Sequence, residues 1–388
     1  MFRKFIYMTL LFSLSLLDVG DIRSSDYETL AKQSLKHADK NRIEISKALR
    51  LVPRKQQEGM EFLVAFMPIG DLQSLSAEFL LQHVEYAYKA WREATWGESI
   101  TKDIFLNNIL PYSNITETRE SWRKDFYERF SAIVKDSSTP GEAAVKLNQE
   151  IFKITNVKYS TSRKRPDQSP SESIASGLAS CSGLSVLLID ACRSVGVPAR
   201  FVGTPMWSNK SGNHSWVEIW NGGWHFTGAC EPAGEDLDRG WFLGRAAQAD
   251  RNSRLHAIYA VSYRPTKQRF PVGWAPEKDW VWAVNVTDRY TQMKEELPTG
   301  IGRVLLGAVD SNGIRVSADI EVRDANGELV FEGTTNDIRF DTNDHLNVKV
   351  KLSERYQILA RYASDTIRRT VNFKKAGVLT LFEFQIEK

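Results

Sequence analysis

The sequence predicts an α+β protein with an N-terminal helical region and a C-terminal all-β sandwich. Three observations carry this prediction. Apolar residues recur at helical spacing as far as about Phe152, a further helix then leads into alternating strand-like segments, and from about Thr299 short strands follow one another at regular spacing. At 388 residues the chain exceeds one ordinary core. We therefore expect a helical region over 25–150, a core of helix packed on antiparallel sheet over 151–298, and a β-sandwich over 299–388.

The first residues are typical of a secretory signal peptide. Arg3 and Lys4 precede the apolar run Phe5–Leu17, which is short for a membrane-spanning helix. No Cys stands directly after this run, so a lipoprotein anchor is not expected. Residues 1–24 are therefore predicted to direct export to a secreted or periplasmic location, with no stable membrane span.

Composition argues against several classes of partner. The formal net charge of +3 is small for this length, so we do not expect nucleic acid as a partner. The three Cys, at positions 181, 192 and 230, have no metal-type spacing such as C-x-x-C, and we expect neither a metal nor a cofactor. Cys192 lies inside an apolar run and is interpreted as a buried, inert thiol.

Helical periodicity is clearest in three segments of the first region, which are 61–67, 77–91 and 122–134. A further helix is predicted to begin at Thr139-Pro-Gly-Glu142 and to run to about Ile154. Thr can cap a helix, Pro suits its first turn, and an acid favours its positive end.

The middle of the chain changes from helix to strand. Residues 156–176 are polar and are predicted to form a loop that leads to an apolar helix beginning at Cys181. The strands predicted after this helix cover 199–204, 215–220, 223–227 and 257–263. Asn221-Gly222, between two Trp-containing runs, predicts a hairpin.

The last region is predicted to be a small β-sandwich whose role is packing, spacing or binding. Asp310-Ser-Asn-Gly313 and Asp324-Ala-Asn-Gly327 supply turns. The strands are predicted at 303–309, 318–323, 329–332, 347–352, 356–362, 368–373 and 378–386.

Cys181 and His214 are the residues that point to chemistry. A thiol needs a lowered pKa and a neighbouring base to act as a nucleophile near neutral pH. The first turn of a helix offers unpaired N–H groups and the positive end of the dipole, which also suit a developing oxyanion. The alternation of Asn213-His-Ser-Trp-Val-Glu218 places His214 on one face of a strand.

Four segments together resemble the transglutaminase-like superfamily, a papain-like group of enzymes, over about residues 150–265. These segments are Gly177-Leu-Ala-Ser-Cys181, Arg193-Ser-Val-Gly-Val-Pro-Ala-Arg200, Asn213-His-Ser-Trp-Val-Glu218 and Gly223-Trp-His-Phe226. The resemblance implies a papain-like core in which Cys181 is the nucleophile and His214 is the general base and acid.

The resemblance also implies an Asp on the strand after His214, but Gly228 stands at that position. Glu231 is the first substitute that we consider, because it lies three residues on and has a longer side chain. Asp236 and Asp238 are weaker candidates. The alternative for Glu231 is a carboxylate at the rim of the site with no catalytic role.

Aromatic residues gather in the same part of the sequence. Five of the eleven Trp lie between residues 207 and 241, as expected of a cleft for an extended or planar substrate or of an aromatic core. Trp207 and Trp241 lie in turn-rich stretches and are predicted to bind substrate. Trp216 and Trp224 are interpreted as core residues.

The leading hypothesis is an exported cysteine enzyme that attacks amide or peptide bonds through a Cys181 thioester. Its predicted substrate is a protein, a peptide or a peptidoglycan stem. Hydrolysis is favoured over acyl transfer to amines, because no amine-acceptor site or calcium loop is recognisable. One alternative is a catalytically silent binding or scaffold protein, and another is a metal enzyme that uses His214, His225 and Glu231.

Overall fold

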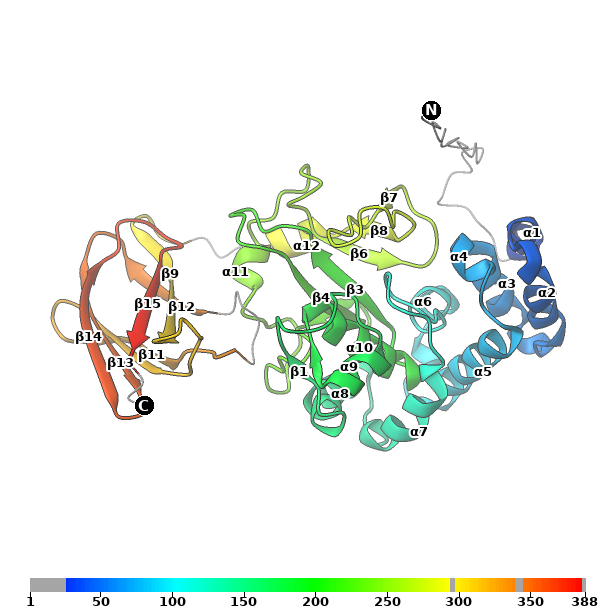
Figure 1. Ribbon diagram of the computed structural model, residues 1–388, viewed down its shortest axis with the longest axis horizontal. Helices are drawn as coiled ribbons and strands as arrows, with labels where there is room; N and C mark the ends of the chain where they lie inside the picture. Colours follow the sequence, from blue (N-terminus) through cyan, green and yellow to red (C-terminus); the bar gives the residue numbers. More distant parts are fainter. Residues whose placement is uncertain (1–25, 294–296, 339–344, 386–388) are drawn as a thin grey trace, which may run out of the picture.

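The computed structural model describes residues 26–293, 297–338 and 345–385. Helices of the first part of the chain lie at one end of the molecule, a mixed helix and sheet core lies in the middle, and a β-sandwich lies at the other end (Figure 1). The predicted signal peptide over 1–24 lies outside the described residues. No helix in the described part of the chain is both long and apolar enough to cross a lipid bilayer. The predicted α+β class is confirmed.

The first half of the chain is helical, as predicted. Its two longest helices begin where a hydroxyl side chain caps the first turn, since Ser76 accepts a hydrogen bond from the Phe79 N–H and Thr139 from the Glu142 N–H. The helices are α1 (Tyr27–Ser34), α2 (Arg42–Leu51), α3 (Gln57–Phe66), α4 (Ile69–Leu72), α5 (Ala77–Glu93), α6 (Lys102–Asn108), α7 (Trp122–Val134) and α8 (Pro140–Ile154). Short 3-10 turns join them at η2 (Leu35–His37), η3 (Asp39–Asn41), η4 (Arg54–Gln56) and η5 (Gly97–Ser99).

A six-stranded antiparallel sheet forms the middle of the molecule, with strand order β5-β4-β3-β6-β8-β7. Its strands are β3 (Ala199–Thr204), β4 (His214–Trp220), β5 (Trp224–Thr227), β6 (Tyr259–Ser262), β7 (Gln268–Arg269) and β8 (Trp282–Asn285). The predicted hairpin between β4 and β5 is present, and Gly222 adopts the positive φ of 75° that its turn requires.

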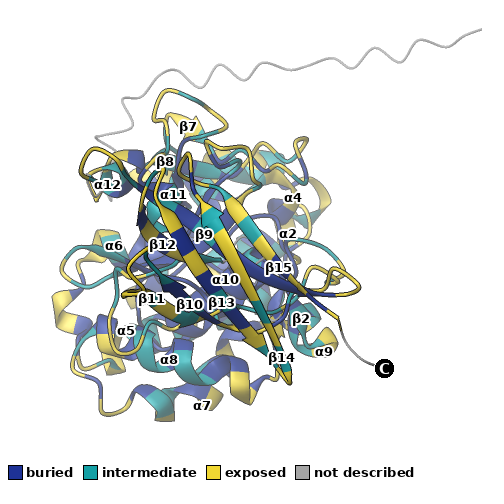
Figure 2. Cartoon of the chain, turned by 90° about the vertical axis from the view of Figure 1, so that its left-hand side faces the viewer, coloured by how far each residue is buried: buried dark blue, intermediate teal, exposed yellow. Residues whose placement is uncertain are grey.

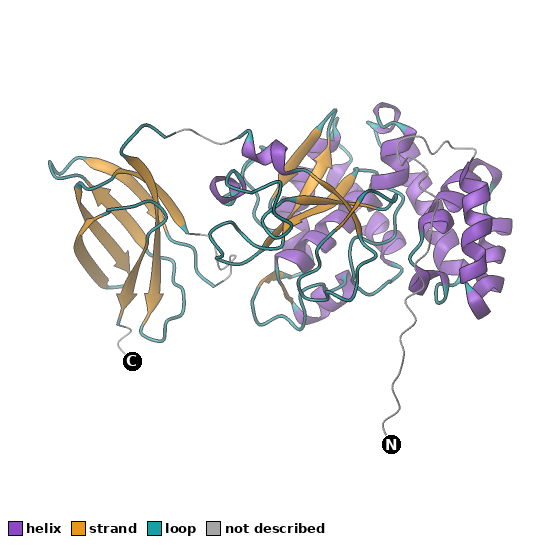
Figure 3. Ribbon diagram, turned by 90° about the horizontal axis from the view of Figure 1, so that it is seen from above, coloured by secondary structure: helices purple, strands orange, loops and turns teal. Residues whose placement is uncertain are grey.

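Helices cover this sheet (Figure 3). The buried helix α10 (Cys181–Ser194) packs against β3 and β4, and α8 also contacts β4. The smaller elements of the core are α9 (Pro170–Ser176), α11 (Leu243–Ala246), α12 (Thr287–Thr291) and the parallel pair β1 (Lys158–Tyr159) and β2 (Leu178–Ala179).

One continuous hydrophobic cluster joins the N-terminal helices to the core, since it includes residues from Tyr27 to Ala283. A second cluster fills the other face of the sheet with Val202, Trp216 and Phe226. The predicted boundary between residues 150 and 151 falls inside α8. Buried residues on both sides of this boundary share the first cluster, and the division of the chain into domains stays a prediction.

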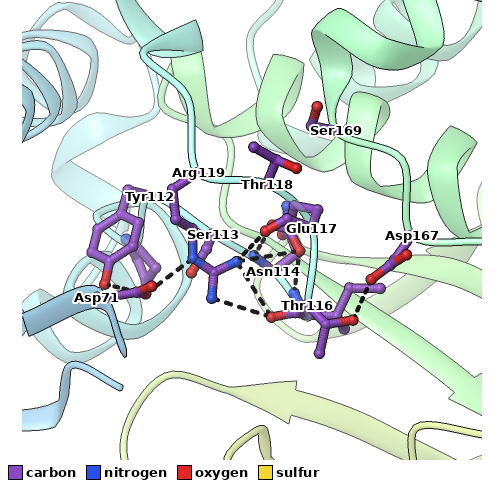
Figure 4. A network of polar contacts seen from close by, with 12 residues as sticks. Asp71, Tyr112, Ser113, Asn114, Thr116, Glu117, Thr118, Arg119, Asp167 and Ser169 are labelled. Atoms are coloured by element: carbon purple, nitrogen blue, oxygen red, sulfur yellow. Dashed lines mark hydrogen bonds and ion pairs between the residues drawn. The ribbon is translucent and has the colours of Figure 1, made fainter. Parts of the chain in front are cut away.

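Polar contacts strengthen the same junction (Figure 4). Asp71 on α4 accepts hydrogen bonds from the Tyr112 hydroxyl at 2.8 Å and from Arg119 Nε at 3.0 Å. The Thr116 hydroxyl donates to Asp167 at 2.6 Å, in the loop that leads toward α10. The irregular segment 112–119 therefore ties the helices to the core.

The C-terminal strands form two sheets, with orders β11-β10-β13-β14 and β12-β9-β15. Buried and exposed residues alternate along β12 and β13 (Figure 2). The strands are β9 (Ile301–Asp310), β10 (Asp319–Arg323), β11 (Leu329–Thr334), β12 (Leu346–Lys351), β13 (Arg355–Tyr362), β14 (Asp365–Asn372) and β15 (Leu379–Phe384). They enclose a hydrophobic cluster of their own, whose members lie between Val304 and Phe384.

Candidate active site

Cys181 is the first residue of α10 and is half-buried. Ser180 precedes it in an extended conformation, and its hydroxyl donates to the Pro166 carbonyl at 3.1 Å. Every other residue of α10 is buried, so the helix is a rigid support for the thiol. The N–H groups at the start of a helix carry the positive end of its dipole, which favours thiolate and a developing oxyanion.

His214 is the first residue of β4 and is 1% exposed. Four aromatic rings surround its imidazole, with centroid distances of 4.8 Å to Trp241, 5.0 Å to Phe242, 5.8 Å to Trp216 and 6.1 Å to Trp207. These rings restrict the orientation of the imidazole and keep bulk water away from most of it.

The residues that follow Cys181 and His214 touch each other. The hydroxyl oxygens of Ser182 and Ser215 lie 3.1 Å apart and form a buried hydrogen bond. Cys181 and His214 are each one residue away from this contact. The helix end that carries the thiol therefore lies beside the strand end that carries the imidazole.

Gly228 leaves a space that the Glu231 carboxylate fills. A β-carbon added at Gly228 would lie 2.5 Å from Glu231 Oε2 and 3.1 Å from Glu231 Cβ, so a side chain there would displace the carboxylate. The two residues also form an antiparallel bridge, in which the Glu231 N–H donates to the Gly228 carbonyl at 3.2 Å. A carboxylate is therefore present beside position 228, although it comes from position 231.

Trp241 connects this carboxylate to the imidazole. Its indole N–H donates to Glu231 Oε2 at 2.9 Å, and its ring lies 4.8 Å from the His214 ring. The two weaker acid candidates are engaged elsewhere. Asp236 pairs with Arg239 at 3.0 Å, and Asp238 accepts from the Phe226 N–H and contacts His225 Nδ1 at 2.6 Å.

Residues 128–229 match the family model of the transglutaminase-like superfamily. This part of the chain is a transglutaminase-like domain. The match begins within α7, well before the predicted start of the core at residue 151, and ends two residues before Glu231. None of the curated proteins matches the chain significantly.

Two solved structures are similar to parts of the chain. One is the crystal structure of a "putative cysteine protease" from Cytophaga hutchinsonii, at 19% identity over 35% of this chain and 44% of that chain, with a TM-score of 0.28. The other is the Bacillus anthracis TIE protein, at 11% identity over 50% of this chain and 31% of that chain, with a TM-score of 0.19. The chain thus spans less than half the length of either structure.

Glu218 of the transglutaminase-like domain has a structural role. It is fully buried, accepts a hydrogen bond from Arg200 Nε at 2.8 Å and one from the Tyr290 hydroxyl at 2.9 Å, and also pairs with Arg289. The Trp216 indole N–H donates to the same Tyr290 hydroxyl at 2.7 Å. This network fixes the strand on which His214 lies, because each buried polar group in it has a partner.

Cys192 and Cys230, the two other thiols of the chain, have pKa values unlike that of a nucleophile. Burial raises the pKa of the Cys192 thiol well above its usual value. Burial, together with the nearby Glu231 charge, raises the pKa of Cys230 to about 12. Neither thiol forms thiolate readily at neutral pH, which agrees with the interpretation of Cys192 as inert.

The aromatic residues that we predicted as substrate-binding differ in exposure. Trp207 is 2% exposed and stacks on Trp216 with ring planes 5° apart. It packs against His214 as part of the buried aromatic cluster. Trp241 is only partly buried. Contact of either ring with substrate stays a prediction, and the burial of Trp207 gives it little support.

His225 lies apart from His214 in the transglutaminase-like domain. It pairs with Ile219 across β4 and β5, whereas His214 shares the opposite face of β4 with Trp216. Among the residues that the structure describes, no group of three or more His, Cys, Asp or Glu could hold a metal ion. The geometry therefore separates two of the three residues that the metal-enzyme alternative requires.

Asn148 on α8 is a further residue near the site that is not among those predicted from the sequence. This buried side chain bonds to the segment that carries Gly228 and Glu231. Its only sequence signal is a polar residue at a position of α8 that the helical periodicity assigns to the buried face, between Leu147 and Ile151.

Proposed function

We propose that this protein is a cysteine enzyme that attacks amide or peptide bonds through a thioester on Cys181. His214 serves as general base and acid, and Glu231 orients the imidazole. The observation that carries the proposal is the Glu231 carboxylate, which fills the space beside Gly228 and bonds to Trp241, whose ring packs against His214.

The proposed reaction begins when His214 takes the proton from the Cys181 thiol. The thiolate attacks the carbonyl carbon, and backbone N–H groups at the start of α10 stabilise the oxyanion. The C–N bond then breaks, and the imidazolium gives its proton to the leaving amine. Water, deprotonated by His214, attacks the thioester, and the released thiolate regains the proton.

Hydrolysis of a protein, peptide or peptidoglycan stem outside the cytoplasm is the finer form of the proposal. It rests on the signal-like residues 1–24 and on the absence of recognisable amine-acceptor features in the sequence. Incubation of the protein with peptide substrates, with and without a fluorescent primary amine, separates hydrolysis from acyl transfer. We expect release of free acid to exceed incorporation of the amine.

Alkylation of thiols with iodoacetamide at neutral pH, followed by peptide mapping, tests the nucleophile. We expect Cys181 to react, and Cys192 and Cys230 to stay unmodified because burial raises the pKa of both thiols. Reaction of Cys230 should appear only as the pH approaches about 12 or when the protein unfolds.

Two His variants complete this test. His214→Ala should slow alkylation of Cys181 by about a hundredfold or more, since a positioned base contributes that much. His225→Ala is the matched control on the neighbouring strand and should leave the rate within about twofold of wild type. If Cys181 does not react, or reacts equally well in His214→Ala, the protein is a binding or scaffold protein rather than an enzyme.

A further inference from the structure

We propose that Asn148 is a positioning residue that holds Glu231 in place through the turn formed by residues 227–231. The inference rests on the proposed function of Cys181, His214 and Glu231. It adds a residue on α8, a helix that carries none of these three. It follows from three hydrogen bonds and from the conformation of the turn that they hold.

The Asn148 side chain spans the turn. It is 3% exposed and reaches from α8 to β5, where its Nδ2 donates to Thr227 Oγ1 at 3.0 Å and to the Gly228 carbonyl at 2.8 Å. Its Oδ1 accepts from the Cys230 N–H at 2.9 Å. Both donors and one acceptor site of the amide are thus used on three nearly consecutive residues.

The turn needs such support because its backbone is strained. Cys230 has a φ of 65°, in the left-handed region that costs a residue with a β-carbon roughly 1–2 kcal/mol. Within the turn itself, the Glu231 N–H bonds to the Gly228 carbonyl at 3.2 Å. The bonds from Asn148 stabilise the conformation from outside, because they hold Thr227, Gly228 and the N–H of Cys230 itself.

This conformation decides where the Glu231 carboxylate lies. The side chain folds back over Gly228 only because the chain reverses at Cys230. A relaxed turn would move the carboxylate away from Trp241 and from the imidazole. Misplacement of a catalytic group by about 1 Å can cost about a hundredfold in rate, so a residue that fixes the turn acts on catalysis through Glu231.

The neighbouring residue Gln149 provides a matched control. It lies on the same helix and donates to the Gly234 carbonyl of the same connection at 2.8 Å, but its contact is exposed and lies beyond Glu231. If a variant acts only by weakening the packing of α8 against this connection, substitution of Asn148 or of Gln149 should lower the reaction rate of Cys181. If the contact specifically places Glu231, only substitution of Asn148 should lower that rate.

The test compares Asn148→Ala, Gln149→Ala and Glu231→Gln in the full chain by the rate of Cys181 alkylation across the pH range in which imidazole titrates. We expect Asn148→Ala to lower the rate about tenfold to a hundredfold and to displace the pH profile in the same direction as Glu231→Gln. Gln149→Ala should stay within about twofold of wild type.

The double variant Asn148→Ala/Glu231→Gln is decisive. If Asn148 acts through Glu231, its loss should lower the rate by no more than about twofold once Glu231 is gone, because residues that act as one unit are not additive. Equal losses in both backgrounds, or no loss from Asn148→Ala, would overturn the proposal. Where Asn148→Ala does not fold, Thr227→Val removes one partner of the amide at nearly constant volume and should lower the rate about threefold.

The proposed function can fail separately. If wild type shows no alkylation of Cys181 that depends on His214, both the function and the positioning role are wrong. If wild type behaves as proposed while Asn148→Ala matches Gln149→Ala, only the positioning role is wrong.

Discussion

Gly228 has no side chain, and the Glu231 carboxylate occupies the space that a side chain at this position would take. A residue with a β-carbon there would collide with Glu231, whose Oε2 occupies that space at 2.5 Å. Gly228 is not among the glycines with positive φ, so its backbone conformation would accept other residues. Glycine is therefore required at position 228 only while the Glu231 carboxylate occupies this space, and the two residues form a compensated pair.

This compensation predicts the outcome of an exchange. Gly228→Asp should lower the rate of Cys181 alkylation about a hundredfold, because the new side chain displaces Glu231, and Glu231→Ala should lower it to a similar extent. The double variant Gly228→Asp/Glu231→Ala should recover at least about tenfold over either single variant, since it places one carboxylate in the vacated space. A double variant that is no faster than the single variants would show that the two positions are not interchangeable.

Part of this site could be predicted from single residues and part could not. The type and local pattern of Cys181 and His214 placed them at a helix start and on a strand, and both placements are confirmed. The spacing made Glu231 a candidate. The return of its side chain over Gly228 could not be predicted, because it depends on a left-handed turn at Cys230, which is not a glycine and gives no turn signal.

At the scale of elements, the segment between α6 and α7 is largely buried although it forms no helix or strand, and hydrophobic periodicity does not predict such a segment. Periodicity located the long helices and the strands, because each buries one face. Residues 109–121 contain no helix or strand, yet Ile109–Glu117 are buried. Arg123 on α7 fixes this path, since its guanidinium donates to the carbonyls of Ile109, Leu110 and Pro111 and to that of Arg193 at the end of α10.

Loss of Arg123 should therefore destabilise the protein strongly. We expect Arg123→Met to lower the free energy of unfolding by about 3 to 5 kcal/mol, because several buried carbonyls lose their donor together. Arg129→Met is the control on the same helix. Its exposed pair with Asp125 at 3.1 Å should contribute no more than about 0.5 kcal/mol. Urea unfolding of the two variants checks the difference, and equal midpoints would contradict this role of Arg123.

At the scale of the whole molecule, the three hydrophobic clusters among the described residues differ in how much of the chain they include. The cluster that contains the helix α3 also contains residues of α10 and of the central sheet. Of the residues that the structure describes, those in the cluster of the C-terminal sandwich all lie at or after Val304. The sequence predicted the sandwich as a separate unit, because strand spacing changes at about Thr299. It gave no sign that the N-terminal helices share a core with the sheet, because the pattern of one helix does not identify its partner.

Two truncations should consequently behave in opposite ways. A chain without residues 299–388 should unfold cooperatively and keep its rate of Cys181 alkylation within about twofold, since the described residues of the sandwich form their own core. A chain without residues 26–93 should not fold. The helix α3 by itself supplies four fully buried side chains, those of Met60, Phe62, Leu63 and Val64. Each contributes about 1.5–3 kcal/mol to a protein whose total stability is about 5–15 kcal/mol. Thermal unfolding followed by circular dichroism distinguishes the two cases. Cooperative unfolding of the chain that lacks 26–93 would show that the helices are an independent domain, and that α10 and the sheet hold Cys181 and His214 without them.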